Sequence, residues 1–142
     1  MKRPRVLLAD DHPMILEEIR SALALNCEIV ETVADGRALV EAALRSEPDL
    51  IVVDITMPLM NGIEAAVQIK KSLPEMKLLF VTMHSSTAYL KAAFEAGGTG
   101  YVLKSRLRDE LSHAVQSVLR GRTFVSHGLS TEYPELLQDP AR

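Results

Sequence analysis

The chain has 142 residues, of which 47% are hydrophobic and 25% charged, and its formal net charge is −3. This length predicts one domain that buries a core without disulfides, and the negative charge excludes a general attraction to nucleic acid or anionic membranes. The single cysteine, Cys27, excludes an internal disulfide. No apolar run approaches the ~20 residues that span a bilayer. We therefore expect a soluble cytoplasmic protein without membrane contact.

Short apolar runs alternate along the chain with segments of helical periodicity. The runs have the length of strands and lie at 6–9, 29–33, 50–53, 78–81 and 100–103. The amphipathic segments lie at 13–25, 36–45, 62–73, 85–96 and 107–119. Most runs are apolar at consecutive positions, which is typical of parallel strands covered on both faces, whereas Glu28 and Glu31 indicate that the second is an edge strand. Successive β–α units predict a parallel sheet with right-handed crossovers and helices on both faces.

The C-terminal part of the sequence differs from the rest. Residues 122–142 lose the periodicity and gain polar and proline residues. We predict a folded domain over residues 4–121, followed by a linker or C-terminal tail over residues 122–142.

Polar residues stand at the ends of four predicted strands, at the edge where parallel α/β sheets bind ligands. They are Asp10 and Asp11 after the first strand, Asp54 after the third, Thr82 after the fourth and Lys104 after the fifth. Three carboxylates close together stay ionised only when cations balance them, and Lys104 supplies one positive charge. Mg²⁺ suits a site with few carboxylates and retained waters. With Mg²⁺ bound, Asp54 can accept a phosphoryl group whose oxygens the metal and Lys104 neutralise.

Four motifs at these strand ends, DDHP, DITMPLMNG, VTMH and GYVLKS, resemble the receiver domain of two-component response regulators. The resemblance covers roughly residues 4–121. Each motif is weak alone, but the four in this order and spacing are highly specific. The resemblance implies an α/β fold of the flavodoxin-like kind: a doubly wound five-stranded parallel sheet in the order 2-1-3-4-5, with five helices.

The resemblance also implies a role for each site residue. Asp54 would be the phosphoacceptor, and Lys104 and Thr82 would contact the phosphoryl group. The metal ligands would be the carboxylates of Asp10, Asp11 and Asp54 and the backbone carbonyl of Thr56. Thr82 and Tyr101 would form the switch, with Tyr101 turning inward as Thr82 moves toward the phosphate.

The function implied is a phosphorylation-dependent signalling switch, not an enzyme with a substrate of its own. A sensor histidine kinase would donate the phosphoryl group. The region of the fourth helix, fifth strand and fifth helix would pass the signal on. The readout would be a homodimer or release of an effector domain. DDHP, TMH and GRTFVS also resemble the NarL/FixJ (LuxR-type) transcriptional regulators. Their helix-turn-helix domain is missing from this sequence, so we expect DNA contact only through that domain. We favour a sequence cut before that domain over a stand-alone receiver.

Two residues depart from the pattern of the broader family. Met83 follows the threonine where a small residue often borders the path to Asp54, which predicts slow autodephosphorylation. Ser105 stands where many receivers carry a cis-proline, so the geometry of the Lys104–Ser105 bond is left open. The histidines His12 and His84 have no His or Cys partner at ligand spacing, and we expect both in solvent-facing loops, with His84 at the rim of the site.

Three other functions are less well supported. A phosphatase of the haloacid-dehalogenase type needs a second aspartate two residues after the nucleophile, where Thr56 stands. A flavin-binding electron carrier needs a hydroxyl- and glycine-rich phosphate loop, and the acidic segment ADDHP occupies that place. A degenerate receiver that takes no phosphate is disfavoured because the constellation of site residues is complete.

Overall fold

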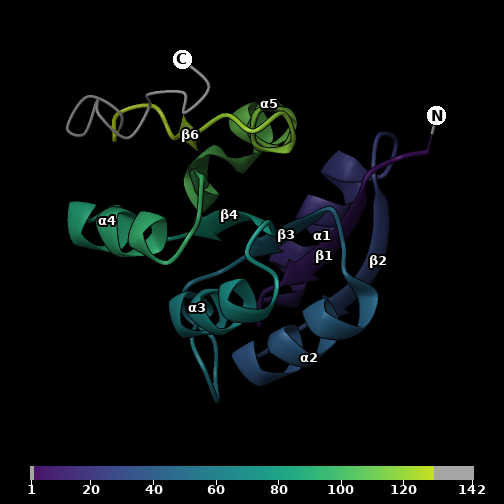
Figure 1. Ribbon diagram of the computed structural model, residues 1–142. Helices are drawn as coiled ribbons and strands as arrows, with labels where there is room; N and C mark the ends of the chain where they lie inside the picture. The colour runs from purple at the N-terminus through teal and green to yellow at the C-terminus, as the bar shows by residue number, and fades with distance from the viewer. Residues whose placement is uncertain (1, 130–142) are drawn as a thin grey trace.

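A computed structural model describes residues 2–129 of the chain. Within them, six strands form one parallel sheet in the order β2-β1-β3-β4-β5-β6 (Figure 1). The strands are β1 (Arg5–Ala9), β2 (Glu28–Val33), β3 (Leu50–Val53), β4 (Lys77–Thr82), β5 (Gly100–Leu103) and β6 (Phe124–Val125). The predicted fold class and the order 2-1-3-4-5 are confirmed, and β6 adds a sixth strand to the five predicted.

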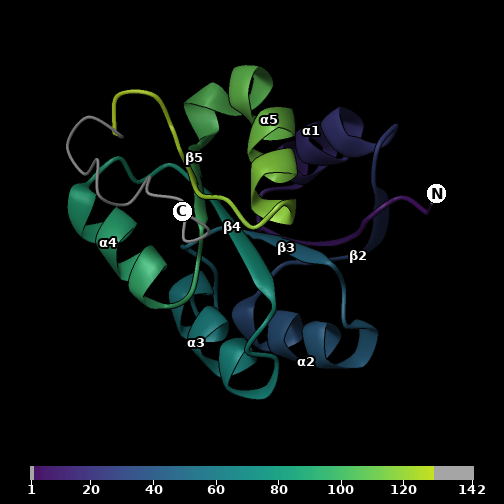
Figure 2. The same cartoon turned by 45° about the horizontal axis from the view of Figure 1, so that its top comes forward.

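Helices cover both faces of the sheet. They are α1 (Pro13–Leu23), α2 (Gly36–Ser46), α3 (Gly62–Ser72), α4 (Thr87–Glu95) and α5 (Leu107–Leu119), with the 3₁₀ turn η1 (Lys104–Arg106) before α5. Figure 2 shows α1 and α5 side by side on one face, and α2, α3 and α4 on the other. No helix between residues 2 and 129 is both long and apolar enough to cross a membrane.

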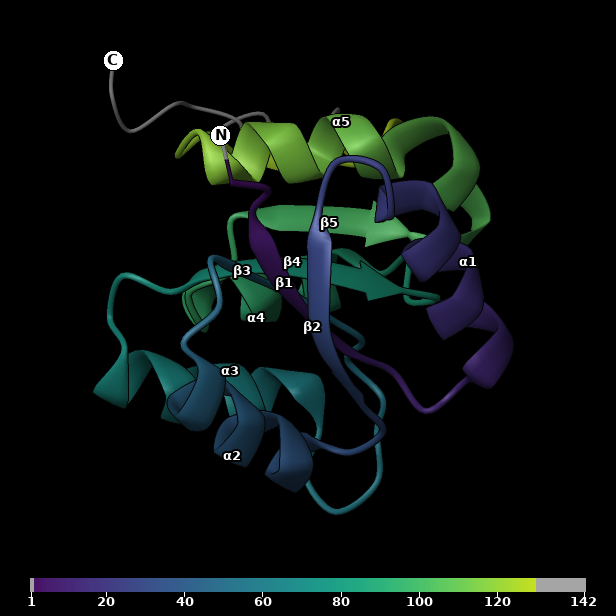
Figure 3. The same ribbon diagram turned by 90° about the vertical axis from the view of Figure 1, so that its right-hand side faces the viewer.

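The continuous apolar runs fill two cores at once, one on each face of the sheet. In β1, Leu7 and Ala9 point into the core under α2, α3 and α4, while Val6 and Leu8 point into the core under α1 and α5. All four are buried because alternate side chains of a strand face opposite sides and both sides are covered. Figure 3 shows the twist of this sheet, in which β2 at one edge stands across β4 and β5.

Local signals set most helix bounds. A capping box of Asn61 and Glu64 begins α3, and Pro13 lies in the first turn of α1. The N-cap of α4 is Ser86, whose side chain accepts a hydrogen bond from Ala88 N, so this helix begins after the predicted position at residue 85. Such shifts at helix ends do not move the site.

The chain after α5 stays on the domain. Phe124 N donates to the carbonyl of Thr99 at 3.0 Å, and Ser126 N donates to that of Tyr101 at 2.9 Å, so β6 pairs with β5. Val125 and Leu129 are buried in the core that also contains α4. Residues 124–129 therefore pack on the sheet, although the sequence predicted a linker or tail from residue 122. The rest of that predicted tail, residues 130–142, lies outside the described residues.

Candidate functional site

The carboxyl ends of β1, β3 and β5 bring Asp10, Asp54 and Lys104 into one buried ion cluster. Asp10 is 1% exposed, Asp54 is 3% exposed and the Lys104 side chain is 6% exposed. Lys104 Nζ lies 2.8 Å from Asp10 Oδ2 and 3.1 Å from Asp54 Oδ2. Parallel strands place these ends at one edge, which is why residues far apart in sequence meet.

The surroundings of Asp54 destabilise its ionised form. Burial raises the pKa of Asp54, the Asp10 carboxylate raises it further, and Lys104 and a hydrogen bond from Ile55 N partly oppose the shift. The net effect is a pKa above the ordinary value of 3.8. Because one ammonium does not balance both buried carboxylates, the cluster favours a further cation.

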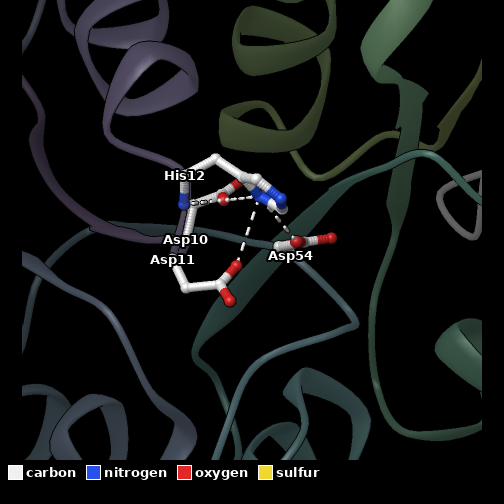
Figure 4. Close-up of side chains that lie close together, drawn as sticks. All are labelled: Asp10, Asp11, His12 and Asp54. Atoms are coloured by element: carbon white, nitrogen blue, oxygen red, sulfur yellow. Dashed lines mark hydrogen bonds and ion pairs between the residues drawn. The ribbon is translucent and has the colours of Figure 1, made fainter.

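An acidic pocket surrounds this cluster. Ligand atoms of Asp10, Asp11, His12 and Asp54 all lie within 4.8 Å of one another (Figure 4). Among residues 2–129, no donor makes a hydrogen bond to Asp10 Oδ2, although the atom is buried; Lys104 Nζ at 2.8 Å is an ion-pair contact without hydrogen-bond alignment. Carboxylate oxygens in this number are compatible with a divalent metal ion.

His12 is exposed, in keeping with the predicted solvent-facing loop, but its ring also lies against the acids of the site, which the sequence did not predict. Its side chain is 52% exposed, yet Nδ1 lies 2.8 Å from Asp10 Oδ1 and 3.2 Å from Asp11 Oδ1. The cause is local: His12 N donates to Asp10 Oδ1 at 2.8 Å, and this turn bends the ring back over the acids. One signal could have indicated this contact: an aspartate, Asp10, stands two residues before the N-cap of a helix, His12.

The loop between β4 and α4 closes the site on its other side. Thr82 is fully buried, and its Oγ1 accepts a hydrogen bond from His84 N at 3.2 Å. The His84 ring stacks on Tyr89 with 4.0 Å between centroids, and its Nε2 lies 2.7 Å from Thr56 Oγ1. His84 thus joins this loop to the loop after β3, at the rim of the site.

Tyr101 connects β5 to the same loop. The side chain is fully buried, and its hydroxyl donates to the carbonyl of His84 at 2.7 Å. Burial raises the pKa of the Tyr101 hydroxyl, so it remains a neutral donor at physiological pH. The Tyr101 ring therefore points inward in this structure, with its hydroxyl on the loop after β4.

Replacing Tyr101 with phenylalanine is expected to lower the free energy of unfolding by about 1 kcal/mol, because the part-buried carbonyl of His84 loses its donor while the ring packing stays. Urea unfolding measures this. Tyr89→Phe is the matched control, since that ring is 41% exposed and its change is expected to be smaller. Equal losses in the two variants would contradict the importance of the Tyr101 hydrogen bond.

The loop after β3 is held tightly against Asp54. Gly62 begins α3, and a Cβ at this position would lie 2.0 Å from the backbone carbonyl oxygen of Asp54. Gly62 N also donates to the carbonyl of Ile55 at 2.7 Å. Only glycine permits this approach, so the motif DITMPLMNG fixes the backbone of Asp54 from both ends of the loop.

The remaining predicted features lie around the pocket. Met83 is 75% exposed and lines a cavity of about 460 Å³ beside Thr82 and Lys104. The Lys104–Ser105 peptide bond, which the sequence left open, is trans. The structure thus brings Asp10, Asp11, Asp54 and Lys104 together, with Thr82 at the end of β4 and Tyr101 on β5.

An open parallel sheet with an acidic pocket and a buried lysine at its carboxyl edge defines the class of signalling receiver domains. The sequence profile of the response regulator receiver domain matches residues 6–116. The chain therefore belongs to the response regulator receiver family, the receiver domains of two-component systems.

Its relatives include transcriptional regulators. The chain is 32% identical over 141 residues to the transcriptional regulatory protein DegU of Brevibacillus brevis, an alignment covering 95% of this chain and 60% of that protein. It is 36% identical over 124 residues to the uncharacterized transcriptional regulatory protein YxjL of Bacillus subtilis, covering 84% of this chain and 56% of that protein. The chain thus spans little more than half the length of these curated relatives.

Solved structures show the same fold. A two-component response regulator of the LuxR family from Aurantimonas superposes with a TM-score of 0.89 at 34% identity, covering 94% of this chain and 97% of that one. The isolated receiver domain of RcsB from Salmonella enterica serovar Typhimurium, solved with the phosphomimetic BeF₃⁻, gives 0.83 at 27% identity, covering 96% of this chain and all (100%) of that one.

Proposed function

We propose that Asp54 accepts a phosphoryl group from a sensor histidine kinase, with Mg²⁺ as the cofactor. The observation that carries this proposal is the buried contact of one ammonium, Lys104 Nζ, with both Asp10 and Asp54. The donor set fits the metal, because Asp10 Oδ2, which accepts no hydrogen bond within residues 2–129, is a hard oxygen beside two further carboxylates. The ligands in this proposal are Asp10, Asp11, Asp54 and the backbone carbonyl of Thr56.

The side chains of the site divide the chemistry between them. A carboxylate oxygen of Asp54 forms the new bond to phosphorus, the phosphorus–nitrogen bond of the kinase phosphohistidine breaks, and its electron pair returns to the imidazole. Lys104 Nζ, already 3.1 Å from Asp54 Oδ2, then donates to a phosphoryl oxygen. Thr82 Oγ1 accepts from His84 N, which leaves its own proton for another phosphoryl oxygen. Bound Mg²⁺ supplies the positive charge that neutralises the remaining oxygens.

The signal would leave through α4, β5 and α5. Thr82 and Tyr101 both bond to His84, so a movement of Thr82 toward the phosphoryl group shifts the backbone that Tyr101 holds. The readouts in this proposal are a homodimer and control of transcription through a separate helix-turn-helix domain; of these, the names of the relatives support transcriptional regulation. The proposal places the protein in the cytoplasm, in keeping with its single cysteine.

The test is reaction with acetyl phosphate, and binding of beryllofluoride, with and without Mg²⁺. We expect one phosphoryl group per wild-type chain in the presence of Mg²⁺ and none in Asp54→Ala, as measured by intact-protein mass spectrometry. Equal labelling of both proteins would overturn the assignment of Asp54. Labelling to the same extent with and without Mg²⁺ would overturn the proposal that Mg²⁺ is the cofactor.

Met83 is expected to slow autodephosphorylation. Its side chain lines the cavity beside Thr82 and Lys104, and we expect it to hinder the approach of water to a phosphoryl group on Asp54 from that side. Met83→Ala is therefore expected to lose acetyl-phosphate-derived phosphate several-fold faster than the wild type. Met76→Ala serves as the control, because Met76 directly precedes β4 and so lies at the opposite end of that strand from Met83. An unchanged rate in Met83→Ala would reject the effect.

A further inference from the structure

The residues that follow α5 are joined to the site by a buried hydrogen-bond network that the proposed function does not use. Ser126 is fully buried, and its Oγ donates to Glu110 Oε1 and accepts from Leu103 N at 2.8 Å. Glu110 is 7% exposed, and its Oε2 accepts from His127 N at 3.0 Å and from Arg106 Nε at 3.3 Å. We refer to Ser126 and Glu110 with these four bonds as the Ser126–Glu110 clamp.

The clamp completes the β5–β6 ladder with a side chain. Pairing between these strands stops at Tyr101 and Val125, so the amide of Leu103, at the end of β5, needs another acceptor. The Ser126 hydroxyl takes that place by accepting from Leu103 N. Buried amides and carboxylates cost stability when they are left without partners, so the two residues depend on each other for satisfaction.

The clamp also encloses the turn that carries Lys104. Leu103, which it holds, directly precedes η1, and Arg106, which bonds to Glu110, ends η1. Lys104 is the first residue of that turn, and its side chain is almost wholly buried. A lysine has four flexible side-chain bonds, so the contacts of its Nζ with two carboxylates require a fixed backbone at its root.

We propose that Ser126 and Glu110 are positioning residues for Lys104, and that phosphoryl binding at Asp54 therefore depends on the chain segment after α5. This inference rests on the proposed function, in which Lys104 contacts the phosphoryl oxygens and the carboxylates of the β1 and β3 ends hold the metal. Loss of the clamp consequently weakens binding of a phosphoryl mimic far more than binding of Mg²⁺. Because coupling is reciprocal, phosphorylation in turn stabilises the docked segment through which the chain leaves the domain.

The experiment measures two affinities on the full chain. Isothermal titration gives the affinity for Mg²⁺ alone, and ¹⁹F NMR gives the affinity for beryllofluoride at saturating Mg²⁺. In Ser126→Ala we expect the beryllofluoride affinity to fall about tenfold while the Mg²⁺ affinity does not fall, since a charge-assisted contact is misplaced and the metal ligands are not. Ser46→Ala is the matched control, because its part-buried hydroxyl bonds to the carbonyl of Ala42 on α2, away from the site.

Each outcome decides the inference. Affinities in Ser126→Ala equal to those of Ser46→Ala, or equal losses of both ligands, overturn it in favour of a merely structural clamp. Glu110→Ala combined with Ser126→Ala is expected to lose little more than either alone, because the two act as one unit. If Ser126→Ala does not fold, Ser126→Cys keeps the volume with weaker hydrogen bonds and is expected to show the same split. A wild-type protein that binds no beryllofluoride overturns the proposed function itself, and this inference with it.

Discussion

Replacing Lys104 with methionine is expected to destabilise the Mg²⁺-free protein by about 3 kcal/mol, because it leaves two buried carboxylates without their shared cation. Methionine fills most of the volume of the lysine stem, so lost packing adds little. Mg²⁺ is expected to stabilise this variant more than it stabilises the wild type, since the metal replaces the lost charge and no ammonium repels it. Beryllofluoride binding is expected to be lost despite tight Mg²⁺ binding.

Urea unfolding at pH 7, with and without Mg²⁺, measures both effects. Lys70→Met is the matched control, because Lys70 Nζ is part-buried and donates to the carbonyl of Met76, away from the carboxylates. We expect its stability to respond to Mg²⁺ as the wild type does. If Lys104→Met behaved like Lys70→Met in both conditions, the ion cluster would not control metal binding.

The sequence predicted the fold and the ion cluster because both follow from short-range patterns and one general property of parallel sheets. Consecutive apolar residues in β1, β3 and β4 indicated strands covered on both faces, and the two cores confirm it. Once the strands are parallel, their carboxyl ends share an edge. Asp10, Asp54 and Lys104 then had to be near one another, although only side-chain rotamers decide the contacts of 2.8 and 3.1 Å.

Features that depend on single long-range contacts were not predictable in this way. β6 has two residues, too few to show a period, and its pairing needs the edge that β5 exposes. Glu110 falls in the first turn of an amphipathic helix, where a carboxylate is normally explained by the helix dipole. Its burial results from Ser126 and His127, which arrive from beyond the helix. The orientation of His12 likewise depends on a turn that no periodicity reveals.

Replacing Asp54 with asparagine is expected to stabilise the Mg²⁺-free protein by about 1 kcal/mol at pH 7, because an unfavourable buried charge disappears and Lys104 keeps Asp10 as its partner. The effect depends on pH in a defined direction. Burial and the neighbouring Asp10 raise the pKa of Asp54 in the folded state, so the folded protein binds the proton more tightly than the unfolded chain does. The wild type therefore carries the full cost of this charge above the raised pKa and loses that cost as the pH falls toward 3.8.

The stability difference between Asp54→Asn and the wild type is thus expected to be constant at neutral pH and to vanish in acid. Saturating Mg²⁺ is expected to reverse the order of the two proteins, because the wild type gains the binding energy of the metal and the variant has lost a charged ligand. Asp49→Asn is the control, since Asp49 accepts a hydrogen bond from Arg5 N at an exposed site and is expected to show neither the acid window nor the reversal. A wild type that remains less stable than Asp54→Asn at saturating Mg²⁺ would show that Asp54 is not a metal ligand. The buried charge of Asp54 is costly to the fold by itself, and this same cost is what makes the site bind a cation before the phosphoryl group arrives.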